Sequence, residues 1–333
     1  MNILVTGALG YIGSHASLEL IRQNYNLVLV DNLFNSERKV LSKIEKLTFK
    51  KIRFEKLDIR NFSQIKSLLY ENKIDAVIHF AGLKSIEESF IESEEYFDVN
   101  VNGTSSLIKA MNEVMDKKIF IFSSSACVYG QPKYLPIDEN HTLFPMNPYG
   151  SNKLEIEQNL IDIHKKERNW NIISLRYFNP VGSEDSFTLG ENSKKNSQNL
   201  MPHITKVALK KDDYFKVYGK DYETKDGTGV RDYIHIMDLI DGHISALRFL
   251  KNKEEYMDFI NLGTGKGYSV IEILETFKKV NSIEVPYKFY PRREGDAASS
   301  FADNSKAKKF LNWKPKRSLE DMCKSAWEYQ KNI

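Results

Sequence analysis

A tyrosine and a lysine near the middle of the chain have the residue types and spacing for proton transfer. Tyr149 and Lys153 follow Asn147 and Pro148, which are favoured at the N-cap and the first position of a helix. On that helix the phenol and the ammonium group lie on one face. A neighbouring cation favours the phenolate, so Tyr149 is predicted to act as a general base on an alcohol. An exposed Tyr–Lys pair on a helix surface is the alternative.

The Tyr-x-x-x-Lys spacing is not specific by itself. The chain has 17 tyrosines, and a second copy of the pattern occurs at residues 129–133. Gly130 and Pro132 within that copy forbid a helix, so its two side chains share no face. The interpretation of Tyr149 therefore depends on independent evidence for redox chemistry.

Three glycines at the start of the chain supply that evidence. Gly7, Gly10 and Gly13 follow an apolar run at 3–6 and open an amphipathic stretch at 11–24. Glycines at a strand-to-helix turn let the backbone approach a pyrophosphate, whose charge the helix N-terminus stabilises. The spacing G-x-x-G-x-x-G differs from the G-x-G-x-x-G of many dehydrogenases, and glycine also serves other strand-to-helix turns. Here the apolar run before the glycines and the amphipathic stretch after them favour a dinucleotide site.

Two acidic residues follow the second and third apolar runs. A carboxylate at Asp31 can accept hydrogen bonds from both adenosine ribose hydroxyls and repels a 2′-phosphate, which favours NAD over NADP. The alternative for Asp31 is a turn residue beside Asn32 and Asn35. Asp58 is predicted to reach the adenine, with a cap for a helix beginning at Phe62 as an equal alternative.

Three serines, Ser123, Ser124 and Ser125, follow the apolar run at 119–122. The carboxyl ends of parallel strands open into the ligand crevice, so a hydroxyl there can bridge the substrate alcohol and the tyrosine. We assign that role to Ser125, and a solvent-capping serine is the alternative for the other two. Cys127 is interpreted as a packed residue at the strand end, because no base is paired with it in the sequence.

The order of apolar and amphipathic segments predicts an α/β fold with a Rossmann-like, doubly wound parallel sheet and helices on both faces. Beyond residue 178 the alternation fades, and a smaller mixed α/β C-terminal substrate lobe is expected. The predicted domains are 1–178 for the dinucleotide and 179–333 mainly for the substrate, with later segments such as 231–260 allowed to return to the first domain. The predicted strands are 3–5, 27–30, 52–57, 76–80, 119–122 and 172–175, and the predicted helices are 11–24, 62–71, 96–115, 149–167, 237–250, 269–279 and 318–330.

The amino-acid composition gives no sign of a nucleic-acid or membrane partner. Of the 333 residues 28% are charged and 41% are hydrophobic, and 48 basic against 45 acidic residues give a net charge of +3. This balance offers no basic tract for nucleic acid or an anionic membrane. No apolar run reaches the roughly 20 residues that cross a bilayer, and no signal-peptide pattern precedes the first strand. Two cysteines imply no disulfide framework. We expect a soluble cytoplasmic protein without nucleic-acid, membrane or metal partners.

Motifs along the whole chain resemble the extended short-chain dehydrogenase/reductase superfamily, and within it the bacterial UDP-galactose (UDP-glucose) 4-epimerases. They are TGALGYIGSH, DNLFNS, IHFAGLKS, NVNGT, FSSSACVYG, NPYGSNK, RYFNPVG, NLMPHI, DGTGVRDYIHIMDL, NLGTGKGYS, PRREGD and the closing NW. The resemblance implies a redox-neutral reaction on a UDP-sugar. A tightly bound NAD takes hydride from C4 of the hexose while Tyr149 removes the O4 proton. The 4-keto sugar then turns its other face, and hydride and proton return with inverted stereochemistry.

The resemblance also implies which residues bind. Ser125 would hydrogen-bond O4, and Lys153 would tune Tyr149 and hold the nicotinamide ribose. The implied NAD-binding residues are Gly7, Gly10, Tyr11, Ile12, Gly13, Asp31, Asn32, Asn35, Ser36, Asp58, Ile59, Phe80, Ala81, Gly82, Lys84, Asn100, Ser123, Tyr149, Lys153, Tyr177 and Phe178. The implied substrate residues are Lys84, Ser125, Asn179, Asn199, Leu200, Tyr218, Arg231, Tyr233, Arg293, Asp296 and Ser300. A homodimer formed through the helices near 96–115 and 149–167 is expected as well.

Two arginines of this set suit a diphosphate. Arg231 and Arg293 can each grip a pyrophosphate with two parallel N–H groups, and Asp296 can accept from the uridine ribose hydroxyls. The alternative is a set of loop ion pairs, Arg231–Asp232 and Arg293–Glu294.

One departure from the family pattern bears on substrate choice. Ser300 occupies the position where enzymes restricted to UDP-galactose and UDP-glucose carry a bulky tyrosine. A small residue there leaves room for a 2-acetamido group, whereas a tyrosine excludes it. The hypothesis is that UDP-GlcNAc and UDP-GalNAc are epimerised as well as UDP-glucose and UDP-galactose.

Two alternatives share the fold. A nucleotide-sugar 4,6-dehydratase needs an acid–base carboxylate just after the strand-end serine, where this chain has Ala126 and Cys127. A non-catalytic NAD-binding regulator typically loses the tyrosine or the lysine, and this chain keeps both.

Overall fold

The computed structural model of the protein describes residues 1–192, 199–293 and 296–333. Its main sheet contains β1 (Asn2–Thr6), β2 (Asn26–Asp31), β3 (Arg53–Lys56), β4 (Ala76–His79), β5 (Lys118–Ser125), β6 (Trp170–Tyr177) and β11 (Tyr256–Leu262). All neighbouring strands are parallel, in the order β11-β6-β5-β4-β1-β2-β3. The direction of winding reverses between β1 and β4, and doubly wound sheets bind ligands at such a point.

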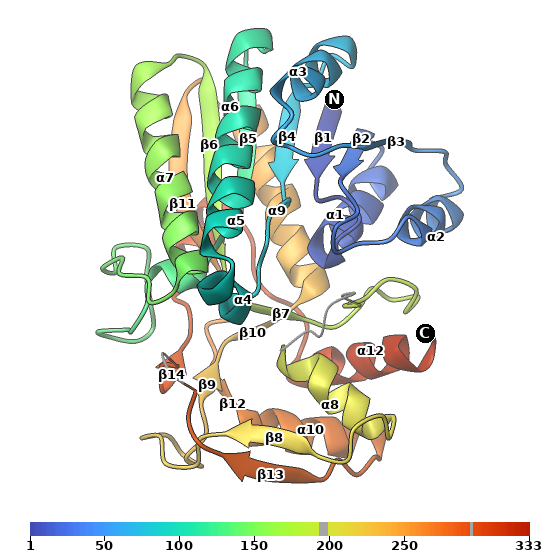
Figure 1. Ribbon diagram of the computed structural model, residues 1–333, viewed down its shortest axis with the longest axis vertical. Coiled ribbons are helices and arrows are strands. Elements are labelled where there is room, and N and C mark those ends of the chain that lie inside the picture. Colours follow the sequence, from blue (N-terminus) through green and yellow to red (C-terminus); the bar gives the residue numbers. More distant parts are fainter. Residues whose placement is uncertain (193–198, 294–295) are drawn as a thin grey trace.

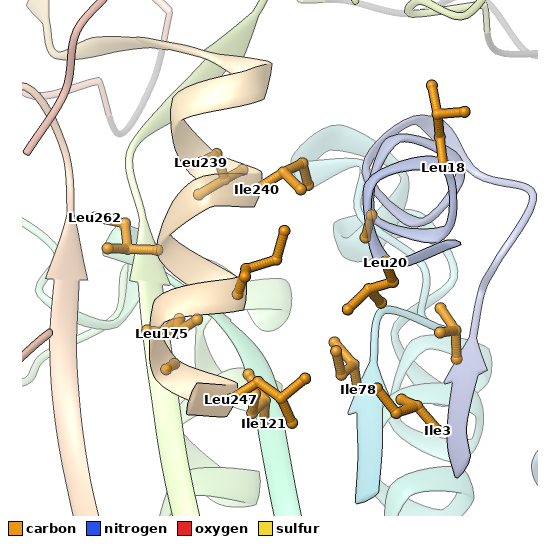
Figure 2. Close-up of a cluster of buried hydrophobic side chains, with 14 of the residues drawn as sticks. Ile3, Leu18, Leu20, Ile78, Ile121, Leu175, Leu239, Ile240, Leu247 and Leu262 are labelled. Atoms are coloured by element: carbon orange, nitrogen blue, oxygen red, sulfur yellow. The ribbon is translucent and has the colours of Figure 1, made fainter. Parts of the chain in front are cut away.

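Helices cover both faces of this sheet, so alternate residues of each strand pack to opposite sides. In β1, Ile3 and Val5 join one hydrophobic cluster and Leu4 joins a second. The first cluster includes side chains of α1 (Tyr11–Arg22), α2 (Lys39–Thr48), α9 (Ile236–Lys251) and α11 (Ser305–Leu311). The second includes side chains of α3 (Phe62–Glu71), α6 (Gly103–Val114) and α7 (Pro148–Lys166). Figure 2 shows the first cluster, in which leucines of α1 and α9 lie over the strands.

A smaller lobe lies beyond the arrowheads of β1 and β4 (Figure 1). Its hydrophobic core is a third cluster, with Phe277 and Trp327 packed edge to face. The lobe contains α8 (Leu200–Ala208), α10 (Val270–Asn281) and α12 (Leu319–Lys331), the paired strands β8 (Phe215–Tyr218) and β13 (Tyr287–Tyr290), and a sheet of β12 (Tyr268–Ser269), β9 (Val230–Arg231) and β14 (Ser299–Ser300). The pair β7 (Asn179–Val181) and β10 (Tyr233–His235) connects the lobe to the main sheet.

The fold class predicted from the sequence is confirmed by this topology. Segments after residue 178 also contribute to the larger layer, because β11 pairs with β6 and α9 packs on the sheet. The assignment of one ligand to each part of the chain stays a prediction.

The single helix predicted for 96–115 is wrong. The segment is α5 (Ser93–Phe97), a π-helical turn (Asp98–Asn102) and α6. Within the π-helical turn, the Asn100 amide hydrogen-bonds both backbone groups of Leu83, at 2.8 and 3.0 Å. A wider turn of this kind frequently marks a functional site. Further helices that were not predicted are α2, α4 (Ile86–Ile91), α8, α11 and a 3₁₀ turn (Ala126–Val128).

A search of the helices in the described ranges finds none with the length and hydropathy to cross a membrane. Within the same ranges, no cluster of histidine, cysteine and acidic side chains could hold a metal ion.

Candidate active site

A cavity of about 1140 Å³ opens where the carboxyl ends of β1, β2, β4, β5 and β6 meet the smaller lobe. Most of the predicted NAD-binding residues line it, together with three of the predicted substrate residues beyond them. The predicted residues that line the cavity are Gly7, Gly10, Tyr11, Ile12, Gly13, Asp31, Asn32, Asn35, Ser36, Asp58, Ile59, Phe80, Ala81, Gly82, Lys84, Ser123, Tyr149, Lys153, Tyr177, Asn199, Arg293 and Asp296.

Other predicted residues lie outside this lining set. Asn100 lies behind the wall, where it fixes the Leu83 backbone. Tyr233 is buried in the core of the smaller lobe, whereas Asn179 is exposed. The full set outside the lining is Asn100, Ser125, Phe178, Asn179, Leu200, Tyr218, Arg231, Tyr233 and Ser300.

The glycine turn at one end of the cavity has backbone geometry that side chains would block. Gly7 has φ of +62°, and a Cβ there would lie 2.6 Å from the Ala81 nitrogen. A Cβ on Gly13 would lie 2.1 Å from the Gly7 oxygen. Gly10 is the N-cap of α1 and provides no side-chain cap, so the first N–H groups of the helix stay open to an anion. This cradle fits a pyrophosphate.

Asp31 links the glycine turn to the loop after β2. One carboxylate oxygen accepts from the Leu9 N–H at 3.0 Å, and the other accepts from the Leu33 N–H and the Ser36 hydroxyl at 2.8 and 2.7 Å. Asp31 is therefore a turn residue, as the alternative interpretation states. Asp31 also lines the cavity, and the Asn35 side-chain oxygen beside it is buried with no hydrogen-bond partner in the described part of the chain. Polar acceptors are thus available where an adenosine ribose would lie.

The helix-cap alternative for Asp58 is wrong. Asn61 caps α3 by accepting from the Gln64 N–H at 3.2 Å. Asp58 instead binds the Arg60 guanidinium at two distances of 2.9 and 3.0 Å and accepts from Asn32 at 3.1 Å. The hydrogen bonds from Arg60 hold the pKa of Asp58 at about 2. Asp58 therefore stays ionised at the edge of the cavity.

Tyr149 and Lys153 lie on one face of α7, as predicted. The Asn147 side chain caps this helix by accepting from the Gly150 N–H at 2.8 Å, and Pro148 is its first residue. Lys153 Nζ lies 5.7 Å from the centre of the Tyr149 ring and donates to the Ser123 carbonyl oxygen at 2.8 Å. The ammonium group is therefore fixed between the tyrosine and the end of β5.

In the protein alone, the pKa of Tyr149 is raised rather than lowered. Burial raises the pKa of this phenol above its usual range, the neighbouring Cys127 raises it further, and a hydrogen bond with Ser125 opposes both. Burial also lowers the pKa of Lys153 to about 8, against the attraction of Glu157. In the protein alone, desolvation outweighs the attraction of the ammonium group for a phenolate. Tyr149 is thus a neutral phenol until a further positive charge approaches.

The solvent-capping alternative for Ser123 and Ser124 is wrong, because both are buried and hydrogen-bonded within the protein. Ser123 Oγ lies 2.7 Å from the Tyr177 hydroxyl. Ser124 donates to Glu157 at 2.6 Å, and Glu157 forms a fully buried ion pair with Arg176 at 2.7 Å. Glu157 lies one helical turn beyond Lys153, a spacing that could have indicated its proximity to the site.

The Cys127 thiol lies beside Ser125, whose side chain accepts from the Cys127 N–H at 3.2 Å. Burial raises the pKa of this thiol. A half-buried thiol with a raised pKa is a poor nucleophile at neutral pH, which agrees with its interpretation as a packed residue.

The far end of the cavity is built by pairing between short strands. In β14, Ser300 pairs in parallel register with Arg231 of β9. Arg231 donates to the Ala297 carbonyl at 2.8 Å and forms an ion pair with Asp296 at 3.3 Å. Three residues predicted to bind the substrate thus lie together, although the sequence separates two of them from Arg231 by more than sixty positions.

The alternative ion pairs for these arginines differ from the structure. The Asp232 carboxylate accepts from the backbone of Thr264, Gly265 and Ala302, at 2.8 to 3.1 Å, and Arg231 pairs with Asp296 instead. Glu294, the other acidic partner suggested, lies outside the described residues. The Arg293 guanidinium lies 4.1 Å from the centre of the Tyr218 ring.

Several cavity residues escaped the sequence analysis. Glu191 receives hydrogen bonds from Lys84, at 3.1 Å, and from Asn199, so it joins two residues of the predicted set. Tyr329 and Met146 also line the cavity, although they come from the last helix and from the loop before α7. No local motif marks these residues, because only the packed fold brings them to the cavity.

Comparison with known proteins adds independent evidence. A family model described as GDP-mannose 4,6 dehydratase matches residues 4–326. The UDP-glucose 4-epimerase of Bacillus subtilis (strain 168) is 47% identical over 99% of this chain and 97% of its own length.

Solved structures agree with that relationship. The UDP-glucose 4-epimerase of Stenotrophomonas maltophila, with bound NAD and formylated UDP-arabinopyranose, is 43% identical with a TM-score of 0.97, covering 100% of this chain and 98% of its own. The enzyme of Bifidobacterium longum, in complex with NAD+ and UDP, is 44% identical with a TM-score of 0.95 and the same coverage of 100% and 98%. The UDP-Glc/GlcNAc 4-epimerase of Campylobacter jejuni is 34% identical with a TM-score of 0.86, covering 100% of this chain and 99% of its own.

Proposed function

The chain belongs to the UDP-glucose 4-epimerases, and from that premise we propose that it interconverts UDP-galactose and UDP-glucose by inversion at C4 with a resident NAD. The observation that carries the proposal is one cavity that joins the glycine cradle, the Tyr149–Lys153 pair, and the arginine and aspartate of the smaller lobe. NAD, when bound, would supply the hydride acceptor and hydride donor that a reversible oxidation at C4 requires.

The residues around the cradle fit this cofactor. The open N-terminus of α1 and the three glycines would hold the pyrophosphate, and Asp31 would accept from the adenosine ribose. A carboxylate at Asp31 disfavours a 2′-phosphate, which supports NAD over NADP. Lys153 Nζ, fixed by the Ser123 carbonyl, would hold the nicotinamide ribose.

Tyr149 moves the proton of the reaction. Its phenolate oxygen would take the proton from O4 as C4 is oxidised, and the resulting phenol would return that proton as C4 is reduced, so the protein gains no net proton in a turnover. Because burial raises the pKa of Tyr149 in the protein alone, its phenolate forms only when positive charge is close. This coupling would keep the base inactive until the positively charged, oxidised cofactor is in place. Ser125, hydrogen-bonded to Tyr149, would hold O4 beside it.

The smaller lobe would hold the UDP group. Arg293 and Asp296 line the cavity, and Arg231 lies against Asp296. Two guanidinium groups match the two phosphates, and the Asp296 carboxylate suits the ribose hydroxyls. Substrate binding would require Asp296 to exchange part of its contact with Arg231 for those hydroxyls.

We further propose that N-acetylated UDP-hexoses are substrates. Ser300 is small and lies in strand register with Arg231, beside the expected UDP site. A bifunctional enzyme, the UDP-Glc/GlcNAc 4-epimerase of Campylobacter jejuni, has a closely similar fold. A pocket without a bulky side chain at this position leaves space for the 2-acetamido group.

Proton NMR tests both proposals. The purified protein, with no added NAD, is incubated separately with UDP-galactose and UDP-N-acetylgalactosamine. New gluco-configured anomeric signals in both samples are expected. Signals from UDP-galactose alone would leave the 4-epimerase in place and remove the N-acetylhexosamine proposal. No signal in either sample, even after NAD is supplied, would favour the non-catalytic NAD-binding alternative.

We also propose a homodimer formed through α6 and α7. Both helices turn polar side chains outward, including Lys109 of α6 and Glu155 and Gln158 of α7. Light scattering coupled to size-exclusion chromatography would measure the mass in solution, and a monomer at all concentrations would contradict the proposal. The cytoplasmic location stays a prediction from the sequence, which cell fractionation would test.

A further inference from the structure

His243 is a buried histidine of α9 that touches the wall of the cavity from behind. Its ring centre lies 5.2 Å from that of Tyr177 and 5.0 Å from that of Phe80, and both of these aromatic residues line the cavity. Its side chain is 1% exposed. No sequence motif had marked His243, because α9 begins nearly sixty residues after β6 ends.

A chain of hydrogen bonds runs from His243 to the end of β5. His243 Nδ1 lies 2.9 Å from the Leu239 carbonyl oxygen, and its Nε2 is hydrogen-bonded to the Tyr177 hydroxyl. That hydroxyl lies 2.7 Å from Ser123 Oγ. The Ser123 carbonyl oxygen, in turn, accepts from Lys153 Nζ at 2.8 Å. Four residues from four elements are thus joined behind the catalytic face.

The direction of this chain follows from the chemistry of its ends. A carbonyl oxygen only accepts, so the Nδ1 atom of His243 must carry the hydrogen. Burial lowers the pKa of His243 to about 4, so at neutral pH the ring has one hydrogen and Nε2 is an acceptor. Tyr177 has one hydrogen but lies within hydrogen-bonding distance of both His243 Nε2 and Ser123 Oγ. We infer that this hydrogen goes to His243, whose Nε2 can only accept, which leaves the Tyr177 oxygen to accept from the Ser123 hydroxyl.

We propose that His243 is a positioning residue of the cofactor site, which orients Tyr177 and, through Tyr177, the Ser123 hydroxyl. With its single hydrogen directed at Tyr177, Ser123 presents only lone pairs to the cavity. An amide N–H donor, such as the carboxamide of nicotinamide, has the matching polarity. The inference rests on the proposed function only in that NAD is the cofactor of this cavity.

The same contacts explain why a histidine is suited to this position. A phenylalanine ring could pack against Phe80 and Tyr177 but could not accept the Tyr177 hydrogen. Tyr177 would then have only Ser123 as an acceptor, and the Ser123 hydrogen would turn towards the cavity. The Ser123 hydroxyl would then present a hydrogen-bond donor to the cofactor instead of an acceptor, although Ser123 itself is unchanged.

The test measures NAD affinity by titrating NAD-free protein and following tryptophan fluorescence. His243→Phe is expected to bind NAD about tenfold more weakly, as for one lost buried hydrogen bond. His243→Gln, whose amide oxygen can accept from Tyr177, is expected to recover most of the affinity. The KM for UDP-galactose, measured at saturating NAD, is expected to stay within about twofold of the wild-type value.

His141→Phe is the matched control. His141 is also buried, its Nδ1 lies 2.8 Å from a carbonyl oxygen, its Nε2 accepts a hydrogen bond, and two tyrosine rings flank it. Unlike His243, it does not line or touch the cavity wall within the described part of the chain. NAD affinity of His141→Phe is expected to match the wild type, even if its melting temperature falls.

A double-mutant cycle with Tyr177→Phe separates positioning from general destabilisation. If His243 acts through the Tyr177 hydroxyl, His243→Phe has no further effect on NAD affinity in the Tyr177→Phe background. His243→Asn, too short to reach Tyr177, provides a second entry to the cycle should the phenylalanine variant not fold. Equal losses in both backgrounds, or wild-type affinity in His243→Phe, would overturn the inference alone. A wild-type protein that binds no NAD would overturn the proposed function as well.

Discussion

The two halves of the cavity are built in different ways. The half around the glycine turn, Asp31, Ser123 and Tyr149, which we call the cofactor half, consists of residues at the carboxyl ends of adjacent parallel strands or at helix starts beside them. The other half, which we call the substrate half, is lined by Arg293 and Asp296, with Arg231 and Ser300 behind them, and depends on three short strands joined across the smaller lobe. In the proposed function, the first half would carry the chemistry and the second would select the sugar. Variants of the two halves should therefore fail in different ways.

Tyr149→Phe should give the largest loss of kcat for UDP-galactose, without weakening the binding of UDP in the substrate half. Removing the hydroxyl removes the proton acceptor for O4, and general acid–base groups of this kind contribute about 1000-fold to the rate. We expect kcat for UDP-galactose to fall by about that factor while NAD content and the affinity for UDP stay near the wild-type values. Calorimetric titration with UDP provides the second measurement. If the variant lost UDP affinity to the same degree as kcat, this would contradict the claim that the two halves have separate roles.

Lys153→Met should lower kcat about 100-fold and at the same time stabilise the NAD-free protein. The pKa of Lys153 is about 8 when folded, against an ordinary 10.5, so burying its charge costs on the order of 3 kcal/mol at pH 7. Removing the buried charge should therefore raise the free energy of unfolding, and the lost hydrogen bond to the Ser123 carbonyl offsets about 1 kcal/mol of that increase.

The stability contributed by Lys153 depends on pH. Between about pH 8 and 10.5 the unfolded chain holds a proton that the folded chain has lost, so wild-type stability from this group rises with pH. Lys153→Met should lack that rise and should be the more stable protein at pH 7. Urea unfolding of both NAD-free chains at pH 7 and 10 measures this, and a less stable Lys153→Met at pH 7 would contradict the account.

Arg293→Lys should produce a smaller defect confined to the substrate half. A lysine keeps the positive charge but cannot form two parallel hydrogen bonds to a phosphate, so we expect KM for UDP-galactose to rise about tenfold with kcat and NAD content little changed.

The adjacent Arg292→Lys is a matched control for Arg293→Lys. Arg292 also lies over a tyrosine ring, at 4.3 Å from Tyr222, but it pairs with exposed Asp221 and does not line the cavity. Equal increases in KM for the two variants would show that replacing any guanidinium on this lobe surface weakens substrate binding, and that no specific contact of Arg293 in the cavity is responsible.

The contrast between the halves also explains what the sequence could predict. The Asn147 cap, the Pro148 start and the Tyr149–Lys153 face depend on residues within one helical turn, and the structure confirms that geometry. The glycine turn is equally local. These features need only backbone sterics and helix geometry, so their patterns are visible in the chain.

Features that depend on long-range packing were missed or misjudged. The π-helical turn at Asp98–Asn102 accompanies the contact of Asn100 with the Leu83 loop, and no propensity within 96–115 signals it. The helix cap that was one of two alternatives for Asp58 is provided by Asn61, because Asp58 pairs with Arg60, a partner that spacing alone could not rank. His243 reaches Tyr177 only because α9 packs behind the sheet. The burial that raises the pKa of Tyr149 in the protein alone could not be judged from a motif either.

The most direct test of the division between the halves is the turnover of UDP-galactose and UDP-N-acetylgalactosamine by Ser300→Tyr, compared with the wild type. A tyrosine beside Arg231 should occupy the space that a 2-acetamido group needs and leave the chemistry at C4 unchanged. The account predicts a loss of UDP-N-acetylgalactosamine turnover of about 100-fold or more, with UDP-galactose turnover within about threefold of the wild-type rate. Unchanged use of both sugars, or an equal loss for both, would contradict it.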